Sequence, residues 1–244
     1  MPTKTSPHVY WFTGIPGTRV RIALTKLAEN LKKQGHDVQI VSIEDQLIAN
    51  YAKRESSNAT KEKEHLLHLK KVGGFKTLLE EPRSLIQDLW SNAAKSCCNE
   101  IKSAVRKKKY VFLTFHATYY ADKFGDMYSP VDIKEIEKFP APSKVITFID
   151  DVYDIATRLR EEGNVFSNRP MGGYDSVKAA LRDLLTILEW RSTELTVSSL
   201  LADLVGGQHF LLAVKHPVLS ASRLVLGKGI PVYVSHSISE SRRH

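Results

Sequence analysis

Short apolar runs alternate along the chain with longer segments in which apolar residues recur every three or four positions. A short continuous apolar run is typical of a buried strand, and the longer period is typical of a helix with one apolar side. The strands predicted in this way are 8–13, 37–43, 110–115, 144–149, 209–214 and, near the end of the chain, 231–235.

Helices are predicted between these strands, at 19–34, 82–108, 130–139, 152–162, 176–205 and 220–226. In the first helix the residues expected to face the core are Ile22, Leu24, Leu27, Ala28 and Leu31. Residues 44–81 have a weaker pattern with a polar, charged beginning, and they predict a variable insertion with one or two helices.

Strands that alternate with helices predict an α/β fold, in which a parallel β-sheet of five to six strands has helices on both faces. Residues 1–228 would form this three-layer sandwich as one domain. Ligands of such sheets bind at the carboxyl ends of the strands. Polar clusters follow four of the predicted strands, at 14–21, 116–120, 150–151 and 215–217, so we expect the functional site at this edge.

The turn after the first strand has the layout of a phosphate-binding loop. Glycines allow a tight turn there, and backbone N–H groups at the start of the following helix point at an anion. The residues of this loop are Gly14, Ile15, Pro16, Gly17, Thr18, Arg19, Val20 and Arg21.

This loop resembles the P-loop of nucleotide-hydrolysing proteins, whose motif is G-x-x-x-x-G-K-[ST]. Gly14 and Gly17 fit the glycine-rich turn. Arg19 stands where the second motif glycine belongs, Val20 where the lysine belongs, and Arg21 where the Mg²⁺-binding Ser/Thr belongs. The loop is therefore a degenerate version of the motif.

Over residues 8–216 the layout resembles nucleoside monophosphate kinases of the adenylate kinase type. In the segment 145–160, a buried strand ends in Asp150 and Asp151, and the following helix carries Arg158 and Arg160. The resemblance implies a lid at 161–174, which contains Arg169, and a phosphate acceptor held near 44–81. A long helix with Arg182 and Arg191 then leads to the strand 209–214.

The resemblance implies binding of ATP or another nucleoside phosphate together with Mg²⁺. Catalytic roles would fall to Asp150, Arg158 and Arg160, and metal binding to Asp150 and Asp151. The nucleotide would be held by the loop residues 14–21 and by His116, Arg169, Lys215 and His216. Guanidinium groups suit this task because they bind phosphate oxygens two at a time.

The departures from the motif predict that phosphoryl transfer is impaired or altered. The arginines would either neutralise the phosphates in a changed geometry, or the domain would act as a non-catalytic scaffold or sensor with a protein partner. Several of these residues also have simpler interpretations: Asp151 as a helix cap, His116 as a core histidine, Tyr119 and Tyr120 as packing, and Glu194 as the partner of Arg191 in an ion pair.

Composition changes this picture in only a few respects. The chain has 244 residues and a net charge of +8, which favours an anionic ligand and leaves nucleic-acid binding open as an alternative. The adjacent Cys97 and Cys98 do not suit an ordinary disulfide, so a cytoplasmic location is expected. No apolar run suits a membrane span. For residues 229–244 the sequence predicts an extra strand and a tail. This segment faintly resembles the start of nucleoside 2-deoxyribosyltransferases, which would imply the beginning of a second domain.

Overall fold

The computed structural model describes residues 6–54, 78–107, 109–122, 124–161, 165–166 and 173–229. Five parallel strands form the central sheet in the order β2-β3-β1-β6-β7. Their bounds are Ser6–Thr13 for β1, Val38–Ser42 for β2, Tyr110–Thr114 for β3, Pro142–Ile149 for β6 and Gln208–Ala213 for β7. The expected α/β fold with a parallel sheet is confirmed.

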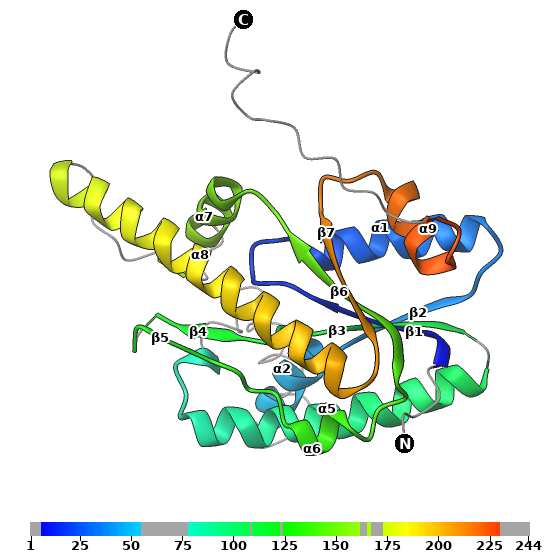
Figure 1. The fold of residues 1–244 in the computed structure, drawn as a ribbon. Helices are drawn as coiled ribbons and strands as arrows, with labels where there is room; N and C mark the ends of the chain where they lie inside the picture. The colour runs from blue at the N-terminus through cyan, green and yellow to red at the C-terminus, as the bar shows by residue number, and fades with distance from the viewer. Residues whose placement is uncertain are drawn as a thin grey trace, which may run out of the picture.

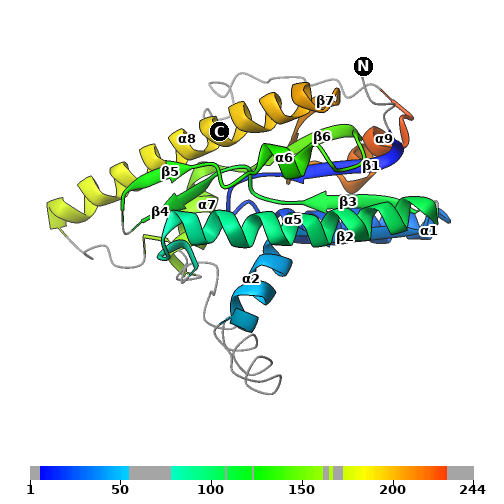
Figure 2. The same ribbon diagram turned by 90° about the horizontal axis from the view of Figure 1, so that it is seen from below.

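Helices cover both faces of this sheet (Figure 1). The helices α1 (Val20–Lys33) and α9 (Val218–Leu226) lie together on one face. The other face carries α2 (Ile43–Arg54), α5 (Arg83–Arg106), α6 (Ile133–Ile136) and the C-terminal half of α8 (Gly173–Leu204). Figure 2 shows that α6 lies between α5 and α8.

Successive side chains of a strand point to opposite faces of the sheet, so the core has two layers. Val9 and Trp11 of β1 point to the face covered by α5, whereas Tyr10 and Phe12 point to the face covered by α1. A third apolar cluster lies where α7 (Val152–Glu161) packs against α8, and it includes the fully buried Trp190. These three clusters hold the loops at the carboxyl edge of the sheet between rigid elements.

The structure departs from the predicted pattern in a few places. Ile22 is 50% exposed, because α1 turns the face formed by Val20, Leu24 and Leu27 toward the sheet. A short antiparallel hairpin of β4 (Tyr119–Ala121) and β5 (Asp126–Tyr128) follows β3 and was not predicted. Each of these strands has only three residues, which is too few for an alternating pattern to be recognised in the sequence.

Some predicted features lie outside the described residues. They are the centre of the insertion, 55–77, most of the lid-like loop 161–174, and the expected strand 231–235 with its tail. In the part of the chain that is described, no helix combines the length and the apolar character needed to cross a membrane.

Candidate functional site

The loop between β1 and α1 requires unusual backbone angles at three residues. Gly14 has φ +149° and Gly17 has φ +85°. A Cβ on Gly14 would lie 2.9 Å from the carbonyl oxygen of Phe148, and one on Gly17 would lie 3.2 Å from side-chain atoms of Ile155 and Leu159. Glycine is therefore needed at both positions because the neighbouring strand and helix α7 approach the loop closely.

Arg19 has φ 57° and ψ 34°, the left-handed conformation that glycine adopts most readily. It stands where the P-loop motif has its second glycine, so the loop keeps this backbone shape at a cost in strain. Arg19 precedes α1 without making a side-chain cap. Among the described residues, no hydrogen-bond partner is found for the backbone N–H groups of Val20 and Arg21, which open the helix.

A buried carboxylate lies beneath the loop. Glu194 on α8 is 1% exposed, and it accepts hydrogen bonds from the backbone N–H groups of Gly14 (2.9 Å), Ala117 (3.0 Å) and Thr118 (2.7 Å). The Thr118 hydroxyl donates a fourth bond of 2.6 Å. Burial raises the pKa of Glu194 above its ordinary value, while His116 and these donors oppose that rise.

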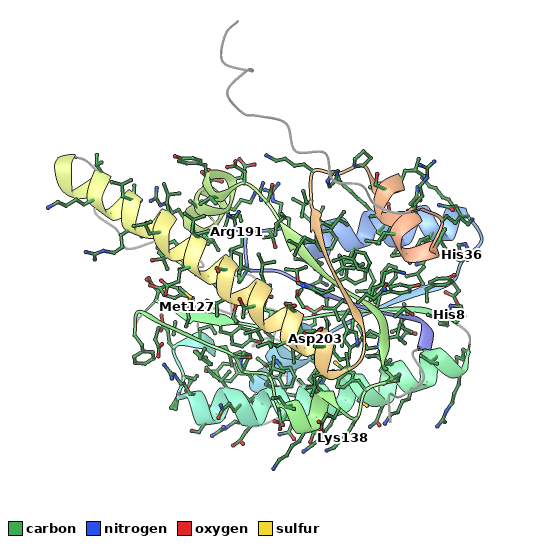
Figure 3. All side chains as sticks on the ribbon, viewed as in Figure 1. His8, His36, Met127, Lys138, Arg191 and Asp203 are labelled. Carbon is green, nitrogen blue, oxygen red and sulfur yellow. The ribbon has the colours of Figure 1, made fainter. Side chains whose placement is uncertain are left out.

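Glu194 therefore ties the start of the loop to the segment that follows β3. The expected ion pair with Arg191 (labelled in Figure 3) is wrong, because Glu194 turns into the core and the two side chains make no ion pair. The signal in the sequence was the spacing of Trp190, Glu194 and Ser198, which lie on the buried side of α8. A glutamate on a buried helix face indicates a bonded carboxylate rather than a surface pair.

His116 and Glu44 extend this polar cluster. The Nδ1 atom of His116 hydrogen-bonds the carbonyl oxygen of Gly14, and the backbone N–H of His116 donates to Glu44 Oε1 at 2.6 Å. Desolvation lowers the pKa of His116, and desolvation raises the pKa of Glu44 to about 7. A neutral His116 is therefore favoured near neutral pH, and Glu44 changes its charge there.

Asp150, Arg158 and Lys215 form a second polar cluster on the opposite side of the loop. Arg158 donates hydrogen bonds to the carbonyl oxygen of Gly17 (2.8 Å) and to Asp150 Oδ2 (2.6 Å). Lys215 lies 2.7 Å from Asp154 Oδ2 and 3.9 Å from Asp150 Oδ1. The hydrogen bond from Lys215 lowers the pKa of Asp154. Arg158 thus fixes the position of the loop relative to the end of β6.

Two cavities flank the loop. One, of about 460 Å³, lies between the loop and α2, and the second, of about 500 Å³, lies between α1, α9 and the end of β7. The residues that line the first include Ile15, Thr18, Arg21, Glu44, His116 and Trp190. Those that line the second include Ile22, Lys26, Asp150, Arg158, Lys215 and His216. Arg19 lines both cavities, so the loop forms the wall between them.

The structure thus gathers most of the predicted site residues at one edge of the sheet, and it leaves others elsewhere. Arg160 pairs with the buried Asp183 at 2.9 Å and lines neither cavity. Asp151 accepts hydrogen bonds from the N–H groups of Tyr153 and Asp154, so it caps α7. Arg169 lies outside the described residues.

The tyrosines after β3 pack inside the protein. Tyr119 is fully buried and Tyr120 lies against Trp190 and Phe166. Neither side chain lines either of the two cavities beside the loop. Packing is therefore the role that the structure gives them.

The described residues offer few ligands for a resident metal ion. Within them, no group of three or more His, Cys, Asp or Glu side chains is arranged to hold one. Asp150 is already paired with Arg158, and the Thr18 hydroxyl donates to the carbonyl oxygen of Ile15 at 2.7 Å. Mg²⁺ that arrives with a nucleotide takes most of its ligands from phosphate and water. The carboxylates that line the two cavities are those of Glu44, Asp45 and Asp150.

The fold and this edge define an α/β protein in which a glycine loop joins the first strand to the first helix between two cavities. No family model matches the chain, and a search of curated proteins finds no match. A solved structure of shikimate kinase from Bacteroides thetaiotaomicron is similar over 90% of this chain and 97% of that chain, with 13% identity and a TM-score of 0.45.

Proposed function

We propose that the protein binds a nucleoside phosphate, with its phosphates on the loop Gly14–Arg21. The observation that carries this proposal is the position of the loop, which separates two cavities and presents the open N–H groups at the start of α1. Backbone N–H groups and the dipole of a helix N-terminus favour a bound anion. Two cavities on either side of one anion site suit a nucleoside and a second small molecule.

Cationic side chains surround this loop and support the binding of an anion. Arg19 lines both cavities, Arg21 lines the first, and Lys26 and Lys215 line the second. Arg21 is held by an ion pair with Asp45 of 2.9 Å, but its side chain is 78% exposed. Such an exposed pair contributes little to stability, so Arg21 can turn toward a phosphate at small cost.

The second cavity suits the nucleoside part of the ligand. Its walls combine the apolar side chains of Ile22, Phe148, Leu212 and Ala221 with charged and polar side chains, which are those of Arg19, Lys26, Asp150, Arg158, Lys215 and His216. Apolar walls together with polar groups that fix orientation are the common form of a small-molecule site. A base would contact the apolar wall, and its sugar would lie toward the loop.

Phosphoryl transfer in this site would be slow or absent. Such transfer depends on positioning and on neutralising charge at the terminal phosphate. Val20 occupies the place of the motif lysine and is buried against the core. The Thr18 hydroxyl is bonded within the loop, and Arg160 is paired with Asp183. The site thus has cations to bind a nucleotide but lacks the usual contacts to its reacting phosphate.

Thermal unfolding with a panel of nucleotides tests this proposal. ATP, ADP, GTP and the monophosphates would each be added with Mg²⁺ and with EDTA. A ligand at about a hundred times its dissociation constant stabilises by about 2.7 kcal/mol, which raises the unfolding midpoint by about 5 to 10 °C. We expect a di- or triphosphate to give this rise, and to keep most of it in EDTA, because the described residues offer few metal ligands.

Inorganic triphosphate is the control for charge alone. If it stabilises the protein as well as every nucleotide does, the site recognises phosphate without a nucleoside, and the proposal fails. The absence of any shift with all nucleotides would also refute it. Binding of oligonucleotides with a steep salt dependence, without any nucleotide effect, would instead favour the nucleic-acid alternative.

A further inference from the structure

The first cavity, between the loop and α2, carries charges of opposite sign on its two sides. Arg19 and Arg21 line it from the loop and the first turn of α1. Glu44 and Asp45 line it from the first turn of α2. Phosphates on the loop would occupy the cationic side, so the acidic side, formed by Glu44 and Asp45, is left for a second ligand.

Glu44 lacks a cation in the part of the chain that the structure describes. Its side chain is partly buried and makes no ion pair there, although its Oε1 atom accepts a hydrogen bond from the backbone N–H of His116. The His116 ring adds no positive charge at neutral pH, because desolvation lowers its pKa. A carboxylate that is partly removed from water favours a cation beside it. A cationic group of a ligand would therefore be stabilised next to Glu44.

Asp45 has a cation, but it is one that a bound phosphate would attract away. Arg21 Nη1 lies 2.9 Å from Asp45 Oδ1, and this exposed pair joins the first turn of α1 to the first turn of α2. When Arg21 turns toward a phosphate, Asp45 loses its partner. The acidic side of the cavity then has two carboxylates and no cation, so nucleotide binding increases its attraction for a positive charge.

Apolar side chains form much of the rest of this cavity. They include those of Ile15, Leu24, Ile40, Ile48, Leu79 and Trp190. The volume of about 460 Å³ lies within the usual range for small-molecule sites. A ligand with an apolar body and one cationic group matches these walls. A phosphate on the second ligand would lie beside two carboxylates once the nucleotide occupies the arginines, and this cost disfavours a nucleoside monophosphate.

We propose that the first cavity binds a small molecule that carries an ammonium group on an apolar body, and that a bound nucleotide strengthens this binding. The ammonium group would lie between Glu44 and Asp45, and the apolar body would contact the isoleucines. Coupling of this kind is reciprocal, so the amine would strengthen nucleotide binding by the same factor. The coupling rests on the proposed nucleotide site, whereas the amine site can be tested without any nucleotide.

An NMR titration of the full chain with benzylamine tests the amine site in the absence of nucleotide. Benzyl alcohol is the neutral control, since it has nearly the same shape without the charge. We expect benzylamine to bind with a millimolar dissociation constant, as is usual for a ligand of this size, and to shift the amide signals of Glu44 and Asp45. Benzyl alcohol should bind at least tenfold more weakly. Cyclohexylmethylamine and cyclohexylmethanol form a second matched pair.

The pH dependence of this binding depends on the groups that face Glu44. They are Asp45 on the same helix, His116 and Tyr119 after β3, Cys97 of α5, and Arg19 and Arg21 across the cavity. Burial raises the pKa of Cys97 to about 12 and raises that of Tyr119, so both stay neutral between pH 6 and 8. Benzylamine stays protonated over this range.

Glu44 is therefore the group expected to control amine binding between pH 6 and 8. Desolvation raises its pKa to about 7, so its ionised fraction increases over this range. The affinity for benzylamine should rise about five- to tenfold from pH 6 to pH 8. Glu44→Gln should remove this rise. Glu29→Gln, on the exposed side of α1 and outside both cavities, should keep it.

Arg21→Ala tests the coupling between the two ligands. In the wild type, saturating ATP should increase the affinity for benzylamine about fivefold. Arg21→Ala releases Asp45 without any nucleotide, so it should give a similar increase by itself, and ATP should then add little. Arg106→Ala removes an exposed cation at the end of α5, outside both cavities, and should behave as the wild type.

The amine site is refuted if benzyl alcohol binds as well as benzylamine, or if Glu44→Gln leaves the affinity and its pH dependence unchanged. The coupling is refuted if a protein that binds ATP shows the same benzylamine affinity with and without it. Binding of ATP with no effect of any amine on the Glu44 and Asp45 signals overturns this inference and leaves the nucleotide site intact. Amine binding without binding of any nucleotide refutes the nucleotide site and the coupling, and supports the amine site.

Discussion

Glu194 ties the loop Gly14–Arg21 to the segment that follows β3. Its two oxygens accept four hydrogen bonds, and three of the donors are backbone N–H groups of Gly14, Ala117 and Thr118. A buried donor that loses its partner costs about 1 to 3 kcal/mol. These four hydrogen bonds therefore stabilise the fold mainly because they leave no buried N–H group of this cluster without an acceptor.

Replacing Glu194 by Gln should destabilise the fold by about 3 kcal/mol. The amide group of Gln would face N–H donors with a donor of its own, so at least one buried bond would be lost. Urea unfolding at pH 7 measures the change. Glu189→Gln, on the exposed side of the same helix, is the control and should change stability by no more than about 0.5 kcal/mol. Equal effects of the two substitutions would show that the Glu194 bonds contribute little.

Glu44 gives the protein a pH-dependent stability of its own. Burial raises its pKa in the folded state to about 7. The folded-state pKa thus lies above the unfolded value near 4.5, so the folded state favours the neutral carboxyl group. This contribution is fully present below the unfolded pKa and is lost as the pH rises through about 7.

Glu44→Gln should therefore stabilise the protein at high pH. Gln keeps an oxygen for the His116 N–H but never ionises. At pH 8 we expect the variant to exceed the wild type by about 2 kcal/mol, less than full burial would give, because Glu44 keeps some contact with solvent. At pH 5 the two should be nearly equal. Urea titrations at both values, with the exposed Glu29→Gln as control, measure this, and a pH-independent difference would contradict it.

Among the elements, α7 shapes the loop Gly14–Arg21 through its contact with Gly17. Gly17 and Gly35 have the same φ, +85°, but only Gly17 is crowded, since a Cβ there would lie 3.2 Å from Ile155 and Leu159. A Cβ on Gly35 would meet nothing within 4 Å. Alanine substitutions at the two glycines can therefore be compared: at Gly35 only the backbone conformation lowers stability, whereas at Gly17 crowding lowers it further.

Gly17→Ala should destabilise the protein by about 1 to 2 kcal/mol more than Gly35→Ala. In both variants the alanine is held in the left-handed backbone conformation, which costs about 1 kcal/mol. Only Gly17→Ala also requires α7 or the loop to move, because the new Cβ is crowded. Urea unfolding measures the stability of each. If the two variants lose equal stability, the loop has room to relax, and α7 does not set its shape.

At the scale of the whole molecule, the sheet and most helices could be predicted from sequence. Their signal is local: apolar runs such as 110–115 and 144–149 and the helical period after Pro82 lie within one segment each. The charged and polar clusters that follow the strands were also correctly expected at one edge of the sheet. Parallel strands bring their carboxyl ends together, so this expectation needs only the fold class.

The contacts between distant segments could not be predicted from the sequence. Glu194 accepts a hydrogen bond from Gly14, 180 residues away in the sequence. Arg160 pairs with Asp183 on α8 and not with the loop. Such pairings depend on how helices rotate about their axes when they pack. A helix period predicts which side is apolar, but a polar side chain on the buried side has no visible partner in the sequence.

We propose above that the loop Gly14–Arg21 binds the phosphates of a nucleotide. Isothermal titration of ATP into the wild-type protein, Arg19→Ala and Arg106→Ala tests it most directly. Arg19 lines both cavities beside the loop, whereas Arg106 is exposed in the last turn of α5 and lines neither of them. We predict one ATP per chain, about tenfold weaker binding for Arg19→Ala, and no change for Arg106→Ala. No binding of ATP, or equal affinity in all three proteins, would contradict the claim.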